Sequence, residues 1–233
     1  MPPITGLAVT ALSVVLLLAT LVARGRQGVH RWIQLGPLTF HVASLSLPLV
    51  LIELDRLLRY ARFAIAIGAI LTIAVILAVQ PDAGQASAFA GSAIVLLICD
   101  RTRVSVTVTA ALALIALAAS ALLRSDPLAP VPYVEEIAIR ISHRGAAWEA
   151  AVVLALALLI VPFGVPMTRG RSPAGLAVAV YLVLSIAASC WGNFPVPILG
   201  YGMSPIIGYF AGWAWLRSVV DHGTSRFADR ASA

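Results

Sequence analysis

The chain has 233 residues, of which 61% are hydrophobic and only 11% are charged, and its mean hydropathy is +0.97. Soluble domains have roughly 45–50% apolar and about 25% charged residues, so this composition excludes an ordinary soluble domain and predicts an integral membrane protein surrounded by lipid. The net charge of +6 does not indicate a nucleic-acid partner, because the arginines stand in short clusters between apolar segments, a pattern that orients proteins in bilayers.

Eight apolar segments are expected to form helices. About 20 apolar residues cross a hydrocarbon layer of about 30 Å, and fewer suffice where a neighbour covers the end. Counted in this way, the segments are 4–23, 38–54, 63–80, 86–99, 104–123, 148–167, 173–191 and 204–220. We therefore predict an all-α polytopic transmembrane helix bundle of about eight spans. The first segment lacks a preceding basic region and a good cleavage site, so we interpret it as a retained span rather than a signal peptide.

The polar connections predict the orientation. Arginines occur in each of the connections 55–62, 100–103 and 168–171 and in the C-terminal tail, which alternate with the connections 24–31 and 124–148. By the positive-inside rule the first set faces the cytoplasm, so we expect a multi-pass protein of the bacterial inner membrane with both termini cytoplasmic. Arg24, Arg26 and Arg31 then lie outside, against the rule.

The expected domain organisation is simple. Residues 1–220 form one transmembrane domain with a large outer loop at 124–148, and residues 221–233 form a cytoplasmic tail. Within the outer loop, IRISHRGAAW (139–148) has the composition of a short amphipathic helix on the membrane surface.

Three stretches at the expected outer face interrupt the apolar pattern. HRWIQLGPLTF (30–40) places a basic residue beside an aromatic one and uses Gly36-Pro37 to begin the next span, and AVQPDAGQAS (78–87) joins the third and fourth spans. GNFPVPILGYGMSPIIGYF (192–210) contains several prolines and glycines, so its backbone cannot be one regular helix. Such backbone is tolerated at membrane depth only where protein or water covers it, which predicts a broken or re-entrant segment lining a cavity before the last span.

These stretches resemble the SEDS family, the FtsW, RodA and SpoVE-like membrane proteins of shape, elongation, division and sporulation. The family pattern is an RRWI-x-LG loop, then QPD-x-GT-A, and finally a proline-led F-x-S-YGGS-S turn. This sequence has HRWIQLGPLTF, QPDAGQA and PILGYGMSPI in the same order, and the resemblance covers roughly 25–220. Known members polymerise lipid II into glycan strands on the outer face, usually with a partner transpeptidase, so the resemblance implies a protein of cell-wall assembly.

The departures from the family pattern are equally specific. The family's glutamate and lysine after the first motif fall on Ser44 and Leu47, so both charges are lost. The long outer loop with the family's essential aspartate has no counterpart, and 126–145 occupies its place. The matching positions are Arg31, Trp32, Ile33, Gly36, Gln80, Pro81, Asp82, Gly84, Tyr201, Gly202 and Ser204.

The resemblance suggests candidate site residues. Glycosyl transfer needs a base that accepts the proton of a sugar hydroxyl and a cation that stabilises the departing diphosphate. Asp82 is the candidate catalytic base, and Arg31 with Arg24 or Arg26 could bind a polyprenyl-diphosphate-linked sugar through charge-assisted hydrogen bonds. The candidate substrate-binding residues are Arg24, Arg26, Arg31, Trp32, Gln80, Tyr201, Gly202 and Ser204. No metal or cofactor is expected, since Cys99 and Cys190 lack ligand or disulfide spacing and the histidines are scattered.

Structural interpretations of the same residues remain open. Asp82 can stabilise a Pro-Asp-x-Gly turn without any catalytic role, and Trp32 is a typical interfacial anchor. His41 can serve as a hydrogen-bonding residue between helices. The charged group of Glu53, Asp55, Arg56 and Arg59 is expected to pair or snorkel at the cytoplasmic edge.

Two functions from different classes follow. The first is a non-catalytic membrane subunit or scaffold of a larger complex, which retains the fold and the outer pocket and has a membrane-protein partner. The alternative is an active peptidoglycan-type glycosyltransferase on a polyprenyl-diphosphate-linked sugar at the outer leaflet. The lost glutamate, lysine and loop aspartate favour the subunit. A transporter is a more distant third interpretation, because Asp82 alone resembles a coupling site and no inverted repeat is evident.

Overall fold

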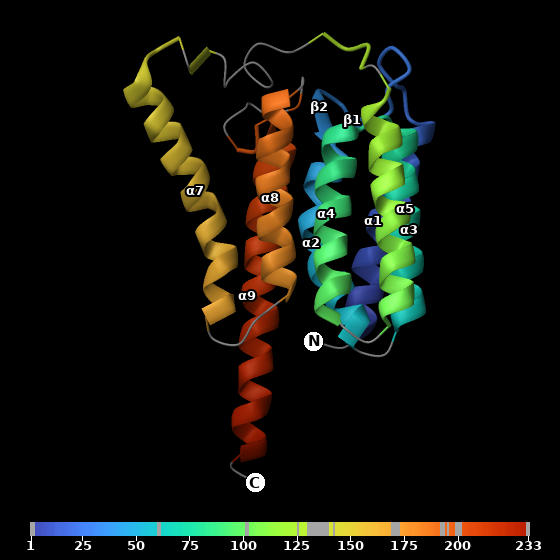
Figure 1. The fold of residues 1–233 in the computed structure, drawn as a ribbon, viewed down its shortest axis with the longest axis vertical. Helices are drawn as coiled ribbons and strands as arrows, with labels where there is room; N and C mark the ends of the chain where they lie inside the picture. The colour runs from blue at the N-terminus through green and yellow to red at the C-terminus, as the bar shows by residue number, and fades with distance from the viewer. Residues whose placement is uncertain are drawn as a thin grey trace.

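Long helices run side by side along the vertical axis of Figure 1, and a small two-stranded hairpin lies at their upper end. The structure is a computed structural model that describes residues 3–59, 62–100, 103–124, 126–129, 140–141, 143–168, 173–191, 194, 196–198 and 202–231. The first helix begins, and the last helix ends, at the end of the bundle away from the hairpin (Figure 1). We call the two ends the hairpin end and the opposite end.

Each of the eight predicted segments overlaps one helix in the described part of the chain. In chain order the elements are α1 (Pro3–Val22), β1 (Trp32–Leu35), β2 (Leu38–His41), α2 (Val42–Arg59), α3 (Phe63–Val79), α4 (Ala83–Asp100), α5 (Val104–Leu122), α7 (Ala146–Thr168), α8 (Pro173–Trp191) and α9 (Met203–Ala231). The prediction of a polytopic helical bundle is therefore confirmed.

The helices have the length and composition of membrane spans. Five of them, α1, α4, α5, α7 and α8, are long and apolar enough to cross a bilayer, and α3 is a shorter apolar helix. The charged residues of α2 and the polar end of α9 lower the hydropathy of these two helices, but both run alongside the others (Figure 1). An integral membrane protein of about eight spans fits this arrangement, because helices satisfy their backbone hydrogen bonds internally in lipid.

The second predicted span was wrong at its start. Residues 38–41 form strand β2, which pairs antiparallel with β1 in the register Trp32↔His41 and Leu35↔Leu38. Gly36 has a φ of +59°, which suits the first position of a two-residue hairpin turn. Gly36-Pro37 is therefore a hairpin turn rather than the beginning of a helix, and the all-α prediction needs this small correction.

The other helix boundaries lie closer to the predicted ones. Helix α2 continues through Arg59, so most of the predicted 55–62 connection is helical, and α4 begins at Ala83 rather than residue 86. The backbone of the expected tail is helical to Ala231, as a continuation of α9. Within the segment 139–148, where a surface helix is predicted, residues 140–141 are helical, residues 143–144 form a turn and α7 begins at Ala146; residues 139 and 142 lie outside the described residues.

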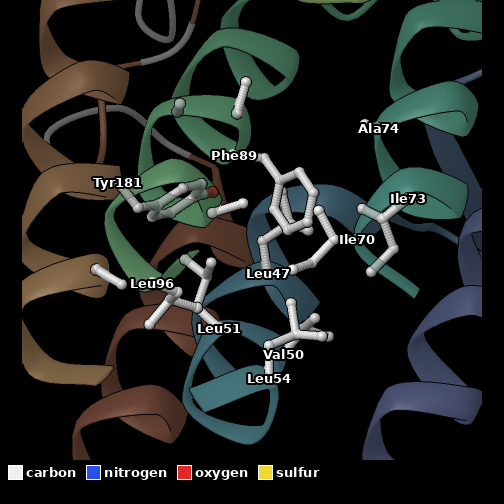
Figure 2. Packing of buried hydrophobic residues seen from close by; sticks show 14 of the residues in the cluster. Leu47, Val50, Leu51, Leu54, Ile70, Ile73, Ala74, Phe89, Leu96 and Tyr181 are labelled. Carbon is white, nitrogen blue, oxygen red and sulfur yellow. The ribbon is translucent and has the colours of Figure 1, made fainter. Parts of the chain in front are cut away.

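The apolar core lies between α2, α3, α4 and α8. Figure 2 shows Leu47 of α2 beside Ile70 of α3 and Phe89 of α4, with Leu51 and Leu54 further along α2, and all five side chains are fully buried. Lipid tails are as apolar as these side chains, so packing within a membrane depends on close van der Waals fit rather than on escape from water. Small residues therefore determine which helices approach most closely.

Helix α9 approaches α2 where α2 contains Pro48. Proline has no N–H, so the carbonyl of Ser44, one turn earlier, lacks its usual helical donor. A Cβ built on Gly208 of α9 would overlap the Ser44 carbonyl oxygen, and one built on Gly212 would lie 2.8 Å from Pro48 Cβ. The two glycines thus bring the α9 backbone against the proline-containing turn of α2, as expected for a small-x-x-x-small helix interface.

The predicted charged group of α2 forms ion pairs, but part of it is buried rather than interfacial. Arg56 Nη1 lies 2.7 Å from both carboxylate oxygens of Glu53, and Arg59 Nε donates to Asp55 at 3.0 Å. Trp215 of α9 also donates to Glu53 through Nε1, and Glu53 is completely buried. Its charge is compensated by these donors, as a buried carboxylate requires.

Candidate functional site

A cavity of about 310 Å³ lies at the hairpin end of the bundle. Its walls come from the hairpin, the α3–α4 turn, the starts of α2, α4 and α9, the end of α8 and the segment between α8 and α9. We call it the hairpin-end cavity. The residues that line it include Arg26, Arg31, Trp32, His41, Ser44, Asp82, Gln85, Phe194, Gly202 and Ser204. The three sequence motifs therefore converge on one cavity.

The segment between α8 and α9 is broken, as the proline pattern predicts. Phe194, Val196 and Gly202 have no regular secondary structure, and Pro197 and Ile198 form a turn. Phe194 lies against Gly84, since a Cβ built on Gly84 would be 2.8 Å from the Phe194 ring. The glycine of the QPDAG turn therefore allows the broken segment to form one wall of the cavity.

Asp82 is the most deeply buried acid in the cavity wall, with 2% of its surface exposed. Its Oδ2 atom lies 2.9 Å from His41 Nε2, and its Oδ1 atom accepts a 3.2 Å hydrogen bond from the backbone N–H of Gln85. The second contact caps the first turn of α4, in the position where aspartate is a favoured N-cap residue. Asp82 thus has both the structural role and the cavity position that the sequence left as alternatives.

The neighbours of Asp82 determine its protonation. Burial opposes ionisation, but the facing His41 ring, its hydrogen bond and the nearby Arg31 guanidinium together hold the pKa of Asp82 below its ordinary value of 3.8. An opposite charge and a donated hydrogen bond both favour the carboxylate form. Asp82 is therefore ionised at neutral pH.

His41 connects the three motif segments. Its backbone N–H donates to Ser204 Oγ at 2.8 Å, and its ring Nδ1 lies 2.8 Å from Ser44 Oγ. Because Nδ1 also accepts from the backbone N–H of Ser44 at 3.3 Å, the proton of a neutral ring lies on Nε2 and points to Asp82. His41 was expected within a span; it lies instead at the end of β2, directly before α2.

Arg31 is buried in the cavity wall with 5% of its surface exposed. Nη2 donates to the carbonyl oxygen of Pro81, and Nη1 lies 2.8 Å from Oδ2 of Asp126. Among the described residues, the buried Nε–H of Arg31 has no hydrogen-bond partner. Arg31 therefore lines the cavity with a guanidinium whose hydrogen bonds within the described part of the chain leave one donor unused.

Trp32 holds the two arginines and the histidine around one indole ring. The Cζ atoms of Arg26 and Arg31 each lie 5.9 Å from the ring centroid, within the range of a cation–π contact. The His41 ring meets the indole edge-on, with centroids 5.9 Å apart. Trp32 is thus part of the cavity wall as well as a residue at the end of the bundle.

The remaining predicted site residues have four different outcomes. Ser204 and Gly202 line the cavity. Arg24 lines an adjacent cavity of about 440 Å³ that shares Arg26 and Trp32 with the first. Gln80 is directed to α1, where it donates to the Leu17 carbonyl at 3.1 Å, and it does not line the hairpin-end cavity. Tyr201 lies outside the described residues.

Sequence reasoning missed three contributors to the site. From the sequence we expect His41 only as a hydrogen-bonding residue between helices. We assign no role there to Gln85, which lies in the predicted connection before the fourth span, or to Asp126, which lies in the predicted outer loop. Tyr181 of α8 donates to Gln85 Oε1, so Gln85 joins α4 and α8 beneath the cavity. A signal for His41 existed, because an antiparallel hairpin around Gly36-Pro37 pairs Trp32 with His41.

Comparisons with known proteins identify the fold. The chain is similar to the crystal structure of RodA, the rod shape determining protein of Thermus thermophilus. The two sequences are 21% identical, and the match covers 89% of this chain and 74% of RodA, with a TM-score of 0.66. The crystal structure of an aspartate-to-alanine mutant of the same protein has the same sequence identity. That match covers 89% of this chain and 75% of the mutant, with a TM-score of 0.68. A scan against protein-family models gives no match, and neither does a search of the curated proteins. The chain is therefore an integral membrane protein with the RodA fold, the fold that its sequence resemblance to the SEDS family implied.

Proposed function

We propose that the chain is a SEDS-derived, non-catalytic membrane subunit or scaffold of a complex that assembles the cell wall during growth or division. In this proposal it spans the bacterial inner membrane with both termini in the cytoplasm, and the hairpin-end cavity faces outward. The cavity retains the ability to bind a polyprenyl-diphosphate-linked sugar. The observation that carries the proposal is the pairing of Arg31, the candidate diphosphate-binding cation, with Asp126 of the chain itself.

The chemistry of the cavity supports a role other than catalysis. An efficient general base has a pKa near the operating pH, whereas His41 and Arg31 keep the pKa of Asp82 below 3.8. Leu47, at the position of the family's lysine, is fully buried in the apolar core, and Ser44 stands at the position of the family's glutamate. The cavity therefore offers Asp82 as a strongly ionised carboxylate but a weak base.

The surface of the bundle supports a membrane-protein partner. Only 6% of the residues in the apolar Ala146–Gly164 stretch of α7 are buried within the protein. In the Val104–Leu122 stretch of α5 the share of buried residues is 17%. Figure 1 shows α7 at one edge of the bundle, beyond α8. Such helices present broad apolar faces on which spans of another protein can pack through small residues and shape complementarity.

Co-purification tests the subunit role. A tagged chain is extracted from its native membrane in a mild detergent, and the bound proteins are identified by mass spectrometry. We expect a stoichiometric multi-pass or single-pass partner of the cell-wall machinery. A chain that purifies alone after extraction in several detergents, and after extraction into native lipid discs, would refute the proposal.

An active glycosyltransferase is the second candidate, and the His41–Asp82 contact favours it. A carboxylate that accepts from one ring nitrogen orients an imidazole and stabilises its protonated form, so His41 could accept a proton in place of Asp82. Both residues line the cavity beside Arg26 and Arg31. In this alternative the substrate is the same polyprenyl-diphosphate-linked sugar, and the two arginines stabilise the leaving diphosphate.

A further inference from the structure

We propose that Asp126 is an internal counter-anion, which occupies the place of the ligand's diphosphate on Arg31 and has to leave before the ligand binds. This inference rests on the proposed role of the hairpin-end cavity as a site for a lipid diphosphate. It adds a means of regulation: the occupancy of the site depends on the balance between a carboxylate of the chain itself and the diphosphate of the ligand.

The first argument is the state of Arg31. Its guanidinium is buried, and its Nη1 atom is held 2.8 Å from Oδ2 of Asp126. The Nε–H has no partner among the described residues and is buried. An unused buried donor is costly to leave without a hydrogen bond, so the Asp126 carboxylate alone does not satisfy Arg31.

The second argument is the place of Asp126 in the wall. Its side chain is 20% exposed, whereas that of Arg31 is 6% exposed. Asp126 therefore lies toward the solvent side of the pair, and it can leave without opening the apolar core. Removal of Arg31, by contrast, would disrupt its contact with Pro81 in the α3–α4 turn.

The third argument is the way the chain presents Asp126. Oδ1 accepts a 3.1 Å hydrogen bond from the backbone N–H of Leu128, which makes a local turn. Two residues before Asp126, Arg124 donates at 3.0 Å to the carbonyl of Ala78 near the end of α3. The turn thus directs one carboxylate oxygen to Arg31, while a separate contact anchors the segment.

The chemistry of the exchange is simple. Carboxylate and phosphate oxygens accept the same charge-assisted hydrogen bonds from a guanidinium. A diphosphate has more charge and more acceptor oxygens than one carboxylate, and Arg26 lines the same cavity as a second cation. When part of the protein population is in a state that cannot bind, the apparent dissociation constant rises by the inverse of the competent fraction.

The test measures diphosphate binding to the full chain in lipid nanodiscs. Two probes are used, farnesyl diphosphate and inorganic diphosphate, so that a lipid diphosphate is distinguished from a free one. Substitution Asp126→Asn removes the competing charge, and we expect it to tighten binding of farnesyl diphosphate by about two- to fivefold, the range expected for a partly exposed ion pair. Glu149→Gln is the matched control, because it removes one exposed acid from the first turn of α7 and should leave binding unchanged.

The double variant Arg31→Gln with Asp126→Asn should lose the gain, because both changes act through one contact. Tighter binding of inorganic diphosphate as well would assign the exchange to the diphosphate alone and support the inference. Equal binding by the wild type and Asp126→Asn, with loss in Arg31→Gln, would overturn the inference and leave the proposed site intact. Absence of binding by both the wild type and Asp126→Asn would overturn the inference together with the site. Thermal unfolding of each variant checks that it is folded.

Discussion

At the residue scale, the centre of the molecule's hairpin end is the pair of Asp82 and His41. Asp82 caps α4 through the Gln85 N–H and also faces His41 across the cavity wall. The backbone of His41 binds Ser204 at the start of α9. One pair therefore holds the hairpin, the α3–α4 turn and the last helix together, so a change in either residue should affect stability as well as ligand binding.

Loss of His41 should be severe, because it leaves a buried carboxylate without its main partner. We expect His41→Ala to lower the free energy of unfolding by about 3–5 kcal/mol, the typical effect of breaking a buried pair. Thermal or denaturant unfolding of the protein in detergent micelles measures this change. His143→Ala, at an exposed position of a turn, is the control and should have little effect. Equal stability of the two variants would show that the pair contributes nothing.

The pH dependence of stability should reveal the ionised Asp82. Because its pKa is lowered in the folded protein, the folded state binds fewer protons than the unfolded state around that pH, and stability falls as the pH decreases. The stabilisation is fully present above the ordinary value of 3.8 and is lost below it. The melting temperatures of wild type and Asp82→Asn should therefore converge as the pH falls below 3.8. A difference that stays constant or grows as the pH falls below 3.8 would contradict this assignment.

At the element scale, apolar length predicted the helices, whereas short and long-range features escaped prediction. A run of about 20 apolar residues is a local property, so each helix could be located from its own segment. The strands β1 and β2 have four residues each, too few for a clear alternation, and Gly36-Pro37 also suits the start of a helix.

The contacts of the site could not be read from the sequence for a different reason. His41 and Asp82 are 41 positions apart, and four helices, α2 to α5, separate Arg31 from Asp126 along the chain. A family comparison located Asp82 and Arg31 but not their partners, because His41 and Asp126 stand outside the shared motifs. The fold had to be known before these pairs could be found.

The interface between α2 and α9 gives a prediction about an element. Gly208→Ala places a methyl group on the Ser44 and Leu45 carbonyl oxygens, so the helices have to separate. We expect a loss of about 1–3 kcal/mol of stability, as for overpacked cores. Gly68→Ala in α3, where an added Cβ meets nothing within 4 Å, is the matched control. It should be neutral or slightly stabilising, because alanine favours helices over glycine.

Unfolding of both glycine variants in the same detergent provides the comparison. If Gly208→Ala were as stable as Gly68→Ala, the close approach of α9 to the turn at Pro48 would not exist in the protein.

At the scale of the whole molecule, the ends of the bundle differ in their chemistry. The hairpin end carries the cavity with Asp82 and Arg31. The opposite end carries a cavity of about 440 Å³ lined by Asp55, Arg59 and Asp100. If the positive-inside rule governs the orientation, the hairpin end faces outward, and the arginines expected on the outside are explained by their place in or beside the cavity.

The two native cysteines test this orientation without the introduction of new ones. Both are free and exposed; Cys99 lines the cavity at the opposite end, and Cys190 lies one residue before the end of α8, near the hairpin end. A membrane-impermeant maleimide added to intact spheroplasts should label Cys190 and leave Cys99 unlabelled until the membrane is permeabilised. Cys190→Ser and Cys99→Ser identify each signal. Labelling of Cys99 in intact spheroplasts would reverse the proposed orientation.

The most direct test of the central proposal, that the chain is a membrane subunit that does not catalyse glycosyl transfer, is a polymerisation assay with lipid-linked disaccharide pentapeptide. The purified chain is assayed alone and with its co-purified partner, and each sample is compared with the Asp82→Ala variant. We predict no glycan strands from the chain alone, and no dependence on Asp82 of any product made by the complex. Glycan strands that form with the wild-type chain and disappear in Asp82→Ala, in protein of unchanged folding, would contradict the claim and establish the enzyme.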